Sequence, residues 1–260
     1  MKSLVITRTI LLLLLFSLSI SAQYEFKDIK TIECTPVKSQ DRTGTCWSFA
    51  TASFIESELI RMGHEEVDLS EMFVVRNIYM DKAFNYVYRQ GKANFSQGSL
   101  AHDLIRAYQR HGAVPESVYP GKSEEDIHDH SEMERALKGM LDGIIKGKTL
   151  TDNWMYAAES VLDVYLGEAP EKFTYEGQVM TPKTFKNRLP INPQDYINLT
   201  SFTHHPFYDD FILEIPDNYS NGQFYNVPLI ELMQVVDHAL ATGYTVAWDG
   251  DVSEESFSGR

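Results

Sequence analysis

Cys46 is the residue of this chain that is best placed for covalent chemistry, because it stands at the head of an apolar segment. The residues that follow it, 47–60, favour a helix that begins at the cysteine. Unpaired N–H groups and the helix dipole at such an end stabilise a thiolate, the nucleophilic form of the side chain. Gln40, six residues earlier, can donate an amide N–H to an oxyanion, together with the backbone N–H of Cys46. These residue types at this spacing predict a thiol nucleophile with an oxyanion donor.

A cysteine beside Trp47 and Phe49 is also typical of a buried core position. Two neighbours favour the nucleophile instead, because Gly44 permits a close approach and Thr45 can cap the following helix. The only other cysteine is Cys34. A nucleophile must stay free, so we expect Cys34 to be an inert or accessory thiol and not a disulfide partner.

The amino-terminal residues 1–22 carry Lys2 and Arg8, then an apolar stretch, and end in Ser21 and Ala22. This pattern predicts a secretory signal peptide over 1–22 and a mature domain over 23–260. The apolar stretch is short for a membrane span, so we expect no stable membrane insertion after cleavage. The predicted location is extracytoplasmic, either periplasmic or secreted.

Composition narrows the classes of partner. The formal net charge of −14 argues against nucleic acid as a partner. The 43% hydrophobic content is enough for a sizeable core in one large or two small domains.

Apolar side chains at helical spacing, with glycines where helices should stop, predict a helical first half. The expected helices are 46–62, one opening at 70–71, 100–111, 131–144 with a capping box at Ser131 and Glu134, 154–165 and 228–242. Beyond residue 170, prolines separate short segments, and 211–215 and 244–248 have the features of strands. This order predicts an α+β fold with a helical half and a sheet half.

The segment Gln40-x5-Cys46-Trp47-x-Phe49-Ala50 resembles the active-site segment of the papain-like cysteine peptidase superfamily, peptidase C1. Residues 68–71 and 112–120 resemble two further segments of that family, and the long insertion 121–225 is similar to its bleomycin hydrolase and aminopeptidase C branch. The resemblance implies a papain-like fold with the helical half largely present and the β-barrel half incomplete.

The same resemblance implies roles for individual residues. Cys46 is the expected catalytic nucleophile of a thiol protease that forms an acyl-enzyme with peptide substrates, and Gln40 is the expected oxyanion donor. Gly98, which precedes Ser99 where relatives carry a Gly-Gly pair, is the expected substrate-binding residue. The branch implies aminopeptidase-type trimming and often a homo-oligomer. We expect no cofactor.

A papain-like site also needs a histidine base and an asparagine that orients it. His204, His205 and His238 are the candidates by position, but none is followed by the family's Asn-x-Trp pattern, and surface or structural roles are favoured. We therefore expect the chain to be truncated before both residues and to show no more than trace peptidase activity. The alternative function is a catalytically inactive truncated or pseudoenzyme module that binds peptides.

His128 and His130 lie in an acidic run that could hold a metal ion. Such runs are usually solvated loops, and the ligand spacing fits no zinc template. We therefore expect no metal site.

Overall fold

The computed structural model describes residues 26–121 and 127–250. The chain divides into two compact units, 1–31 and 32–260, and every helix and strand named below lies in the second unit. The expected signal segment, 1–22, lies outside the described residues. The helices are α2 (Cys46–Arg61), α3 (Glu71–Tyr88), α4 (Ala101–His111), α5 (Ser131–Ile144), α6 (Asn153–Leu166), α7 (Pro182–Lys186), the 3-10 helix η1 (Pro193–Asp195) and α8 (Leu229–Thr242). The strands are β1 (Phe173–Tyr175), β2 (Gln178–Met180), β3 (Leu199–Thr200), β4 (Asp210–Ile212) and β5 (Gln223–Asn226).

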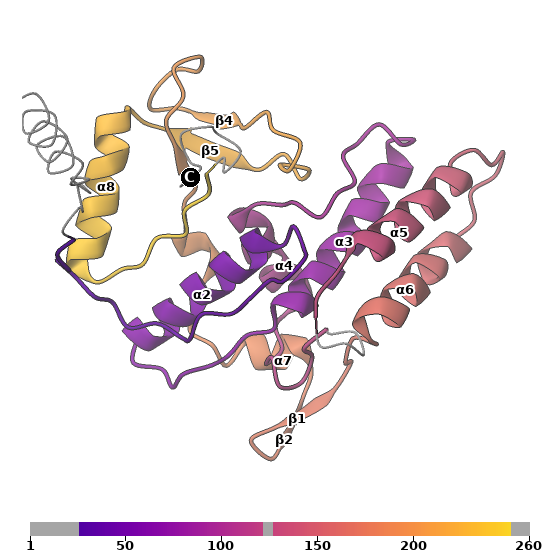
Figure 1. The fold of residues 1–260 in the computed structure, drawn as a ribbon, viewed down its shortest axis with the longest axis horizontal. Coiled ribbons are helices and arrows are strands. Elements are labelled where there is room, and N and C mark those ends of the chain that lie inside the picture. Colours follow the sequence, from indigo (N-terminus) through magenta and orange to yellow (C-terminus); the bar gives the residue numbers. More distant parts are fainter. Residues whose placement is uncertain (1–25, 122–126, 251–260) are drawn as a thin grey trace, which may run out of the picture. The chain divides into compact units, whose positions relative to one another are not determined.

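Helix α3 organises the helical part because apolar side chains cover most of its circumference. It packs against α2, α4, α5 and α6, and Figure 1 shows α3, α5 and α6 side by side. Met72, Val75 and Val87 of α3 are fully buried in this core. Burying one such side chain stabilises the fold by about 1.5–3 kcal/mol. Because α2 belongs to the same core, its amino end, where Cys46 lies, is held by a rigid scaffold.

The helix ends confirm most of the sequence prediction. Ser70 caps α3, and its hydroxyl accepts a hydrogen bond from the N–H of Phe73 at 3.0 Å. Helices α4 and α6 end at Gly112 and Gly167, whose φ angles of 95° and 82° favour glycine. The predicted helix boundaries in this part of the chain are therefore set by local chemistry.

The predicted capping box at Ser131 is wrong. Ser131 is the first residue of α5, and the N-cap residue is His130, whose carbonyl oxygen accepts from the N–H of Glu134 at 2.9 Å. The carboxylate of Asp129 accepts a hydrogen bond from the N–H of Ser131 at 3.0 Å. It thus provides an acceptor for a backbone N–H at the start of α5, the function that was expected of the capping hydroxyl. The helix starts near the predicted position with a different set of contacts.

The described residues contain two small sheets and no closed barrel. Strands β1 and β2 form an antiparallel hairpin. In the second sheet, β5 lies between β3 and β4, parallel to β3 and antiparallel to β4. The α+β class with an incomplete barrel half is thus confirmed, while the predicted strand 211–215 is shorter and begins one residue earlier, as β4.

Residues 244–248 do not form the predicted strand. A strand needs a partner for its backbone groups, and no described segment pairs with this one. Tyr244 and Trp248 remain exposed, and the guanidinium of Arg61 lies 4.0 Å from the ring centre of Tyr244. Helix α8 has no buried residue. Among the described helices, none combines the length and the apolar character needed to cross a bilayer.

Candidate active site

Cys46 is the first residue of α2 and is exposed to solvent. Its side chain lines a cavity of about 70 Å³ between α2, the start of α4 and the segment that follows α8. The residues that line this cavity are Cys46, Trp47, Ala50, Thr51, Ala101, Ala247, Trp248 and Asp249. A substrate group that enters the cavity therefore meets the thiol at the amino end of a helix.

The first backbone N–H groups of α2 are hydrogen-bond donors of the kind that bind anions. The N–H groups of Ser48 and Phe49 both donate to the carbonyl of Thr45, at 2.9 and 3.3 Å. No described residue accepts a hydrogen bond from the N–H of Cys46 or Trp47, as expected for the first positions of a helix. Donors of this kind can stabilise an oxyanion that develops beside the sulfur. Thr45 occupies the N-cap position, but its side chain makes no capping bond and instead meets the hydroxyl of Thr43 at 2.5 Å.

Gln40 holds the loop before the helix. Its Nε2 donates to the carbonyl of Thr43 at 2.5 Å, and the hydroxyl of Thr43 donates back to the carbonyl of Gln40 at 2.8 Å. Gln40 is half-buried and does not line the cavity of Cys46. One of its two amide N–H bonds is thus engaged in the loop, and its role as oxyanion donor stays a prediction from the sequence.

Gln97, which the sequence analysis missed, joins the nucleophile loop to the segment that carries Gly98. Its Oε1 accepts from the N–H of Gly44 at 2.7 Å, and its carbonyl accepts from the indole N–H of Trp47 at 3.0 Å. A Cβ added at Gly44 would meet the Cβ of Gln97 at 3.1 Å, so a side chain there would push the two segments apart. This close approach explains the glycine beside the nucleophile.

The backbone of Gly98 lies against the carboxylate of Asp217. A Cβ added at Gly98 would collide with that carboxylate, so the absence of a side chain makes room for it. The carbonyl of Gly98 accepts from the ammonium of Lys82, which also donates to the carbonyl of Ser96 at 2.8 Å. Lys82 is buried, and burial lowers its pKa to about 8 against the opposing effect of Asp217. The sequence-predicted substrate residue therefore sits in an acidic setting that only the tertiary structure reveals.

A second carboxylate, that of Asp249, lines the cavity of Cys46. Neighbouring protein atoms displace part of its water, and this burial raises the pKa of Asp249, with a further contribution from the negative charge of Asp217. The two carboxylates thus interact across the same region of the site. Such a pair favours a cationic group on the substrate.

No histidine lines the cavity in the described part of the chain. His204 and His205 contact Glu214, and His238 is an exposed residue of α8, as its helical periodicity predicts. The structure therefore does not bring any of the three histidines to the thiol.

The other pair singled out by sequence, His128 and His130, is buried and not solvated. Their ring centres lie 6.3 Å apart. Burial, followed by the neighbouring His128, lowers the pKa of His130 to about 4. Neither residue belongs to a potential metal-binding group among the described residues. Cys34 is free and exposed, and so is Cys46.

Comparisons with known proteins concern the family and the fold of this chain. Residues 20–136 match the family described as papain family cysteine protease. Among solved structures, the chain is similar to PepW from Lactobacillus rhamnosis HN001 (DR20), with a TM-score of 0.61 and 18% sequence identity. The match covers 84% of this chain and 59% of PepW, so this chain spans less than two thirds of the length of that protein. A search of the curated proteins finds no match. Residues 20–136 are thus similar to the papain family of cysteine proteases, and the fold of the chain is similar to that of PepW.

Proposed function

We propose that this chain carries the nucleophile of a cysteine-type peptidase that hydrolyses peptide bonds through Cys46. The observation that supports this most directly is the exposed thiol at the amino end of α2, beside two backbone N–H groups without an acceptor among the described residues. The thiolate sulfur attacks the carbonyl carbon, and the oxygen becomes an oxyanion. Collapse of this intermediate expels the amine, which takes up a proton, and leaves a thioester. Water then releases the acid and restores the thiol.

The proton chemistry needs a group that accepts the proton of the attacking water. Among the described residues, Asp249 is the only carboxylate or imidazole that lines the cavity. By the resemblance to papain-like peptidases, we assign the role of base to a histidine. None of the histidines among the described residues lines the cavity of Cys46. The mature domain, residues 23–260, is proposed to act outside the cytoplasm on the basis of its apolar leader.

The finer proposal is that this peptidase removes residues from the amino end of peptides. Asp217 and Asp249 set two carboxylates beside the site, and the protonated amino group of a peptide is the cation that every peptide offers. We expect peptides with a free amino terminus to react faster than their amino-acetylated counterparts, and Asp249→Asn to reduce this preference. Equal rates for both peptides would contradict the aminopeptidase proposal while leaving the thiol chemistry intact.

A second candidate function is a peptide-binding module without turnover. The absence of a histidine from the cavity lining among the described residues favours it. Peptide binding, measured by fluorescence anisotropy with Cys46→Ala as the turnover-free reference, distinguishes this candidate from the peptidase. Binding of equal strength by both forms, without any release of product by the wild type, is the result expected for a module of this kind.

The test of the nucleophile uses the chain's own matched control. Cys34 and Cys46 are both exposed, so accessibility alone gives neither an advantage. We expect iodoacetamide to modify Cys46 faster than Cys34, because only Cys46 lies at a helix amino terminus. The rates are measured by mass spectrometry of digests after timed exposure, and Cys46→Ala confirms the assignment. Equal rates, or faster labelling of Cys34, would remove Cys46 as the nucleophile.

A further inference from the structure

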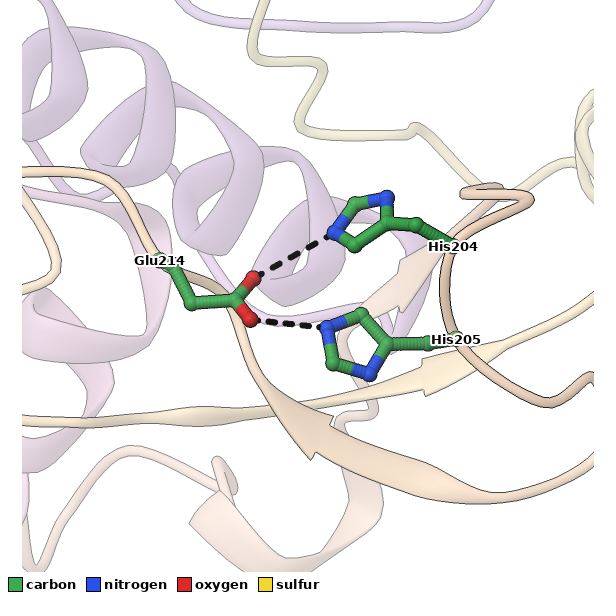
Figure 2. Close-up of side chains that lie close together, drawn as sticks. All are labelled: His204, His205 and Glu214. Carbon is green, nitrogen blue, oxygen red and sulfur yellow. Dashed lines mark hydrogen bonds and ion pairs between the residues drawn. The ribbon is translucent and has the colours of Figure 1, made fainter.

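Three side chains with metal-binding atoms meet in the sheet part of the molecule. His204 and His205 lie in the loop between β3 and β4, and Glu214 follows β4. The Nε2 of His205 lies 2.8 Å from one carboxylate oxygen of Glu214, and the Nε2 of His204 lies 3.5 Å from the other (Figure 2). One such atom from each side chain lies within 4.8 Å of the others, and no second group of this kind occurs in residues 26–121 and 127–250.

The donor set selects the class of metal. Two imidazole nitrogens and one carboxylate oxygen suit Zn²⁺, which binds each of these atoms at about 2.0–2.2 Å. Tetrahedral ligands at that bond length are about 3.3 Å apart. The observed separations of 2.8 and 3.5 Å lie on either side of this value. The two distances run to different oxygens of Glu214, and the ligand atoms of the three side chains lie within 4.8 Å of one another, so the side chains must draw together to surround one ion.

Aromatic contacts hold both imidazole rings. The ring of His205 stacks on Phe211, with centres 4.0 Å apart and an interplanar angle of 18°. The ring of His204 meets the ring of Phe202 edge to face at 5.3 Å. Rings fixed in this way lose little rotational freedom when they bind an ion, which favours affinity.

Two buried asparagines clamp the backbone that carries the ligands. Asn226 of β5 is 0% exposed, and its Nδ2 donates to the carbonyls of Phe202 and His205 at 2.8 and 3.1 Å. Asn218 is also buried, and its Nδ2 donates to the carbonyl of Leu213, the residue before Glu214, at 2.9 Å. Supporting contacts of this type orient metal ligands in known sites. Here they fix both stretches of chain from which the ligands project.

We propose that His204, His205 and Glu214 bind one Zn²⁺ ion. Three protein ligands leave a coordination position for water. The side chains of His204, His205 and Glu214 are 57%, 25% and 60% exposed, so the ion enters directly from solvent. None of the three lines the cavity of Cys46, and the site is therefore separate from the thiol chemistry. The ion links the loop before β4 to Glu214, two residues beyond the end of β4, and stabilises the sheet formed by β3, β5 and β4.

The test measures Zn²⁺ alone, on protein whose two thiols have been blocked with iodoacetamide so that they cannot bind the metal. Competition with a chromophoric chelator should give one Zn²⁺ per chain. We expect His205→Ala and Glu214→Gln each to weaken the affinity by about tenfold or more, the scale on which even supporting residues act. His238→Ala is the matched control, because His238 is an exposed histidine of α8 outside the cluster, and it should bind as the wild type does.

A thermal melt with and without Zn²⁺ gives the second readout. Zn²⁺ should raise the melting temperature of the wild type and of His238→Ala, and should raise that of Glu214→Gln much less. Because His205→Ala also loses its stack on Phe211, the near-isosteric Glu214→Gln decides the matter if the alanine variant fails to fold. Absence of binding by the wild type, or unchanged affinity in Glu214→Gln, would overturn the proposal. Blocked thiols carry no peptidase activity, so either result is independent of the proposed function.

Discussion

Removal of the Lys38 ammonium should expose how the nucleophile loop is anchored. Lys38 precedes Gln40 by two residues, and its Nζ lies 2.6 Å from Glu71, 3.4 Å from Glu56 and in contact with Asp68. Glu56 and Glu71 are only 1% and 2% exposed. The positive charge of Lys38 thus compensates two buried carboxylates, one on α2 and one on α3.

The expected cost of Lys38→Met follows from these contacts. Removing one partner of a buried ion pair costs about 3–5 kcal/mol, because the remaining charge is left without compensation. The Lys38 side chain is 24% exposed, which places the expected loss near the lower end, at about 3 kcal/mol. In a chain of this size, that corresponds to a fall in melting temperature of roughly 6–12 °C.

The free energy of unfolding lost in Lys38→Met should depend on pH, because the protonation of Glu71 depends on pH. Burial, opposed by Lys38, raises the pKa of Glu71 from 4.5 to about 7. The folded chain therefore holds an extra proton between these values, and the free energy of unfolding falls as pH rises from 4.5 to 7. Without Lys38 the pKa of Glu71 rises further, so the decline continues above pH 7. We expect Lys38→Met to cost more at about pH 8.5 than at about pH 5.5, by about 1.4 kcal/mol for each further unit.

Urea unfolding followed by tryptophan fluorescence at the two pH values measures both quantities. Lys172→Met is the matched control, because Lys172 is exposed and makes no ion pair among the described residues. It should unfold as the wild type does. A loss from Lys38→Met below about 1 kcal/mol, the value for a surface pair, or one of equal size at both pH values, would refute the reasoning.

Three further outcomes follow from the site. Gln40→Ala should lower the free energy of unfolding by about 1 kcal/mol through the lost bond to Thr43, and in an active form of the enzyme should lower kcat by about 10²-fold if the second amide N–H serves the oxyanion; a thermal melt beside titrated kinetics separates the two. Gly98→Ala should displace the carboxylate of Asp217 at a cost of about 1 kcal/mol, and the double variant with Asp217→Ala should recover most of that loss in urea unfolding. Burial lowers the pKa of Lys82 from 10.5 to about 8, so the unfolded chain binds more protons between these pH values. The free energy of unfolding should therefore rise from pH 8 to 10.5, and Lys82→Met should abolish this rise.

Local chemistry explains which parts of the fold could be predicted from sequence. Helix α2 begins at Cys46 and α4 stops at Gly112, because apolar spacing and glycine conformation act within a few residues. The strand predicted at 244–248 failed because alternation describes only one half of a pair. Its partner would have to come from elsewhere in the chain, and the described residues supply none. Helix positions that depend on local spacing could therefore be predicted, although the capping contacts at Ser131 differ, whereas a strand that needs a distant partner could not.

The same distinction applies to the candidate site. Cys46 and Gln40 could be found because they lie six residues apart in one loop. Gln97 and Asp217 could not, because their contacts with Gly44 and Gly98 join residues 53 and 119 positions apart. Neither has a local signal, since Gln and Asp are ordinary surface residues in a single sequence.

The two histidines in the sheet part show how a distant contact changes the interpretation of a residue. By their position in the sequence, His204 and His205 are candidate proton acceptors for Cys46. The fold instead places both Nε2 atoms on Glu214, through a loop whose backbone Asn226 fixes from 20 to 24 residues away. An imidazole held by a carboxylate and two phenylalanines cannot also serve a cavity that it does not line. The geometry that removes these histidines from the peptidase chemistry is therefore the same geometry that qualifies them as metal ligands.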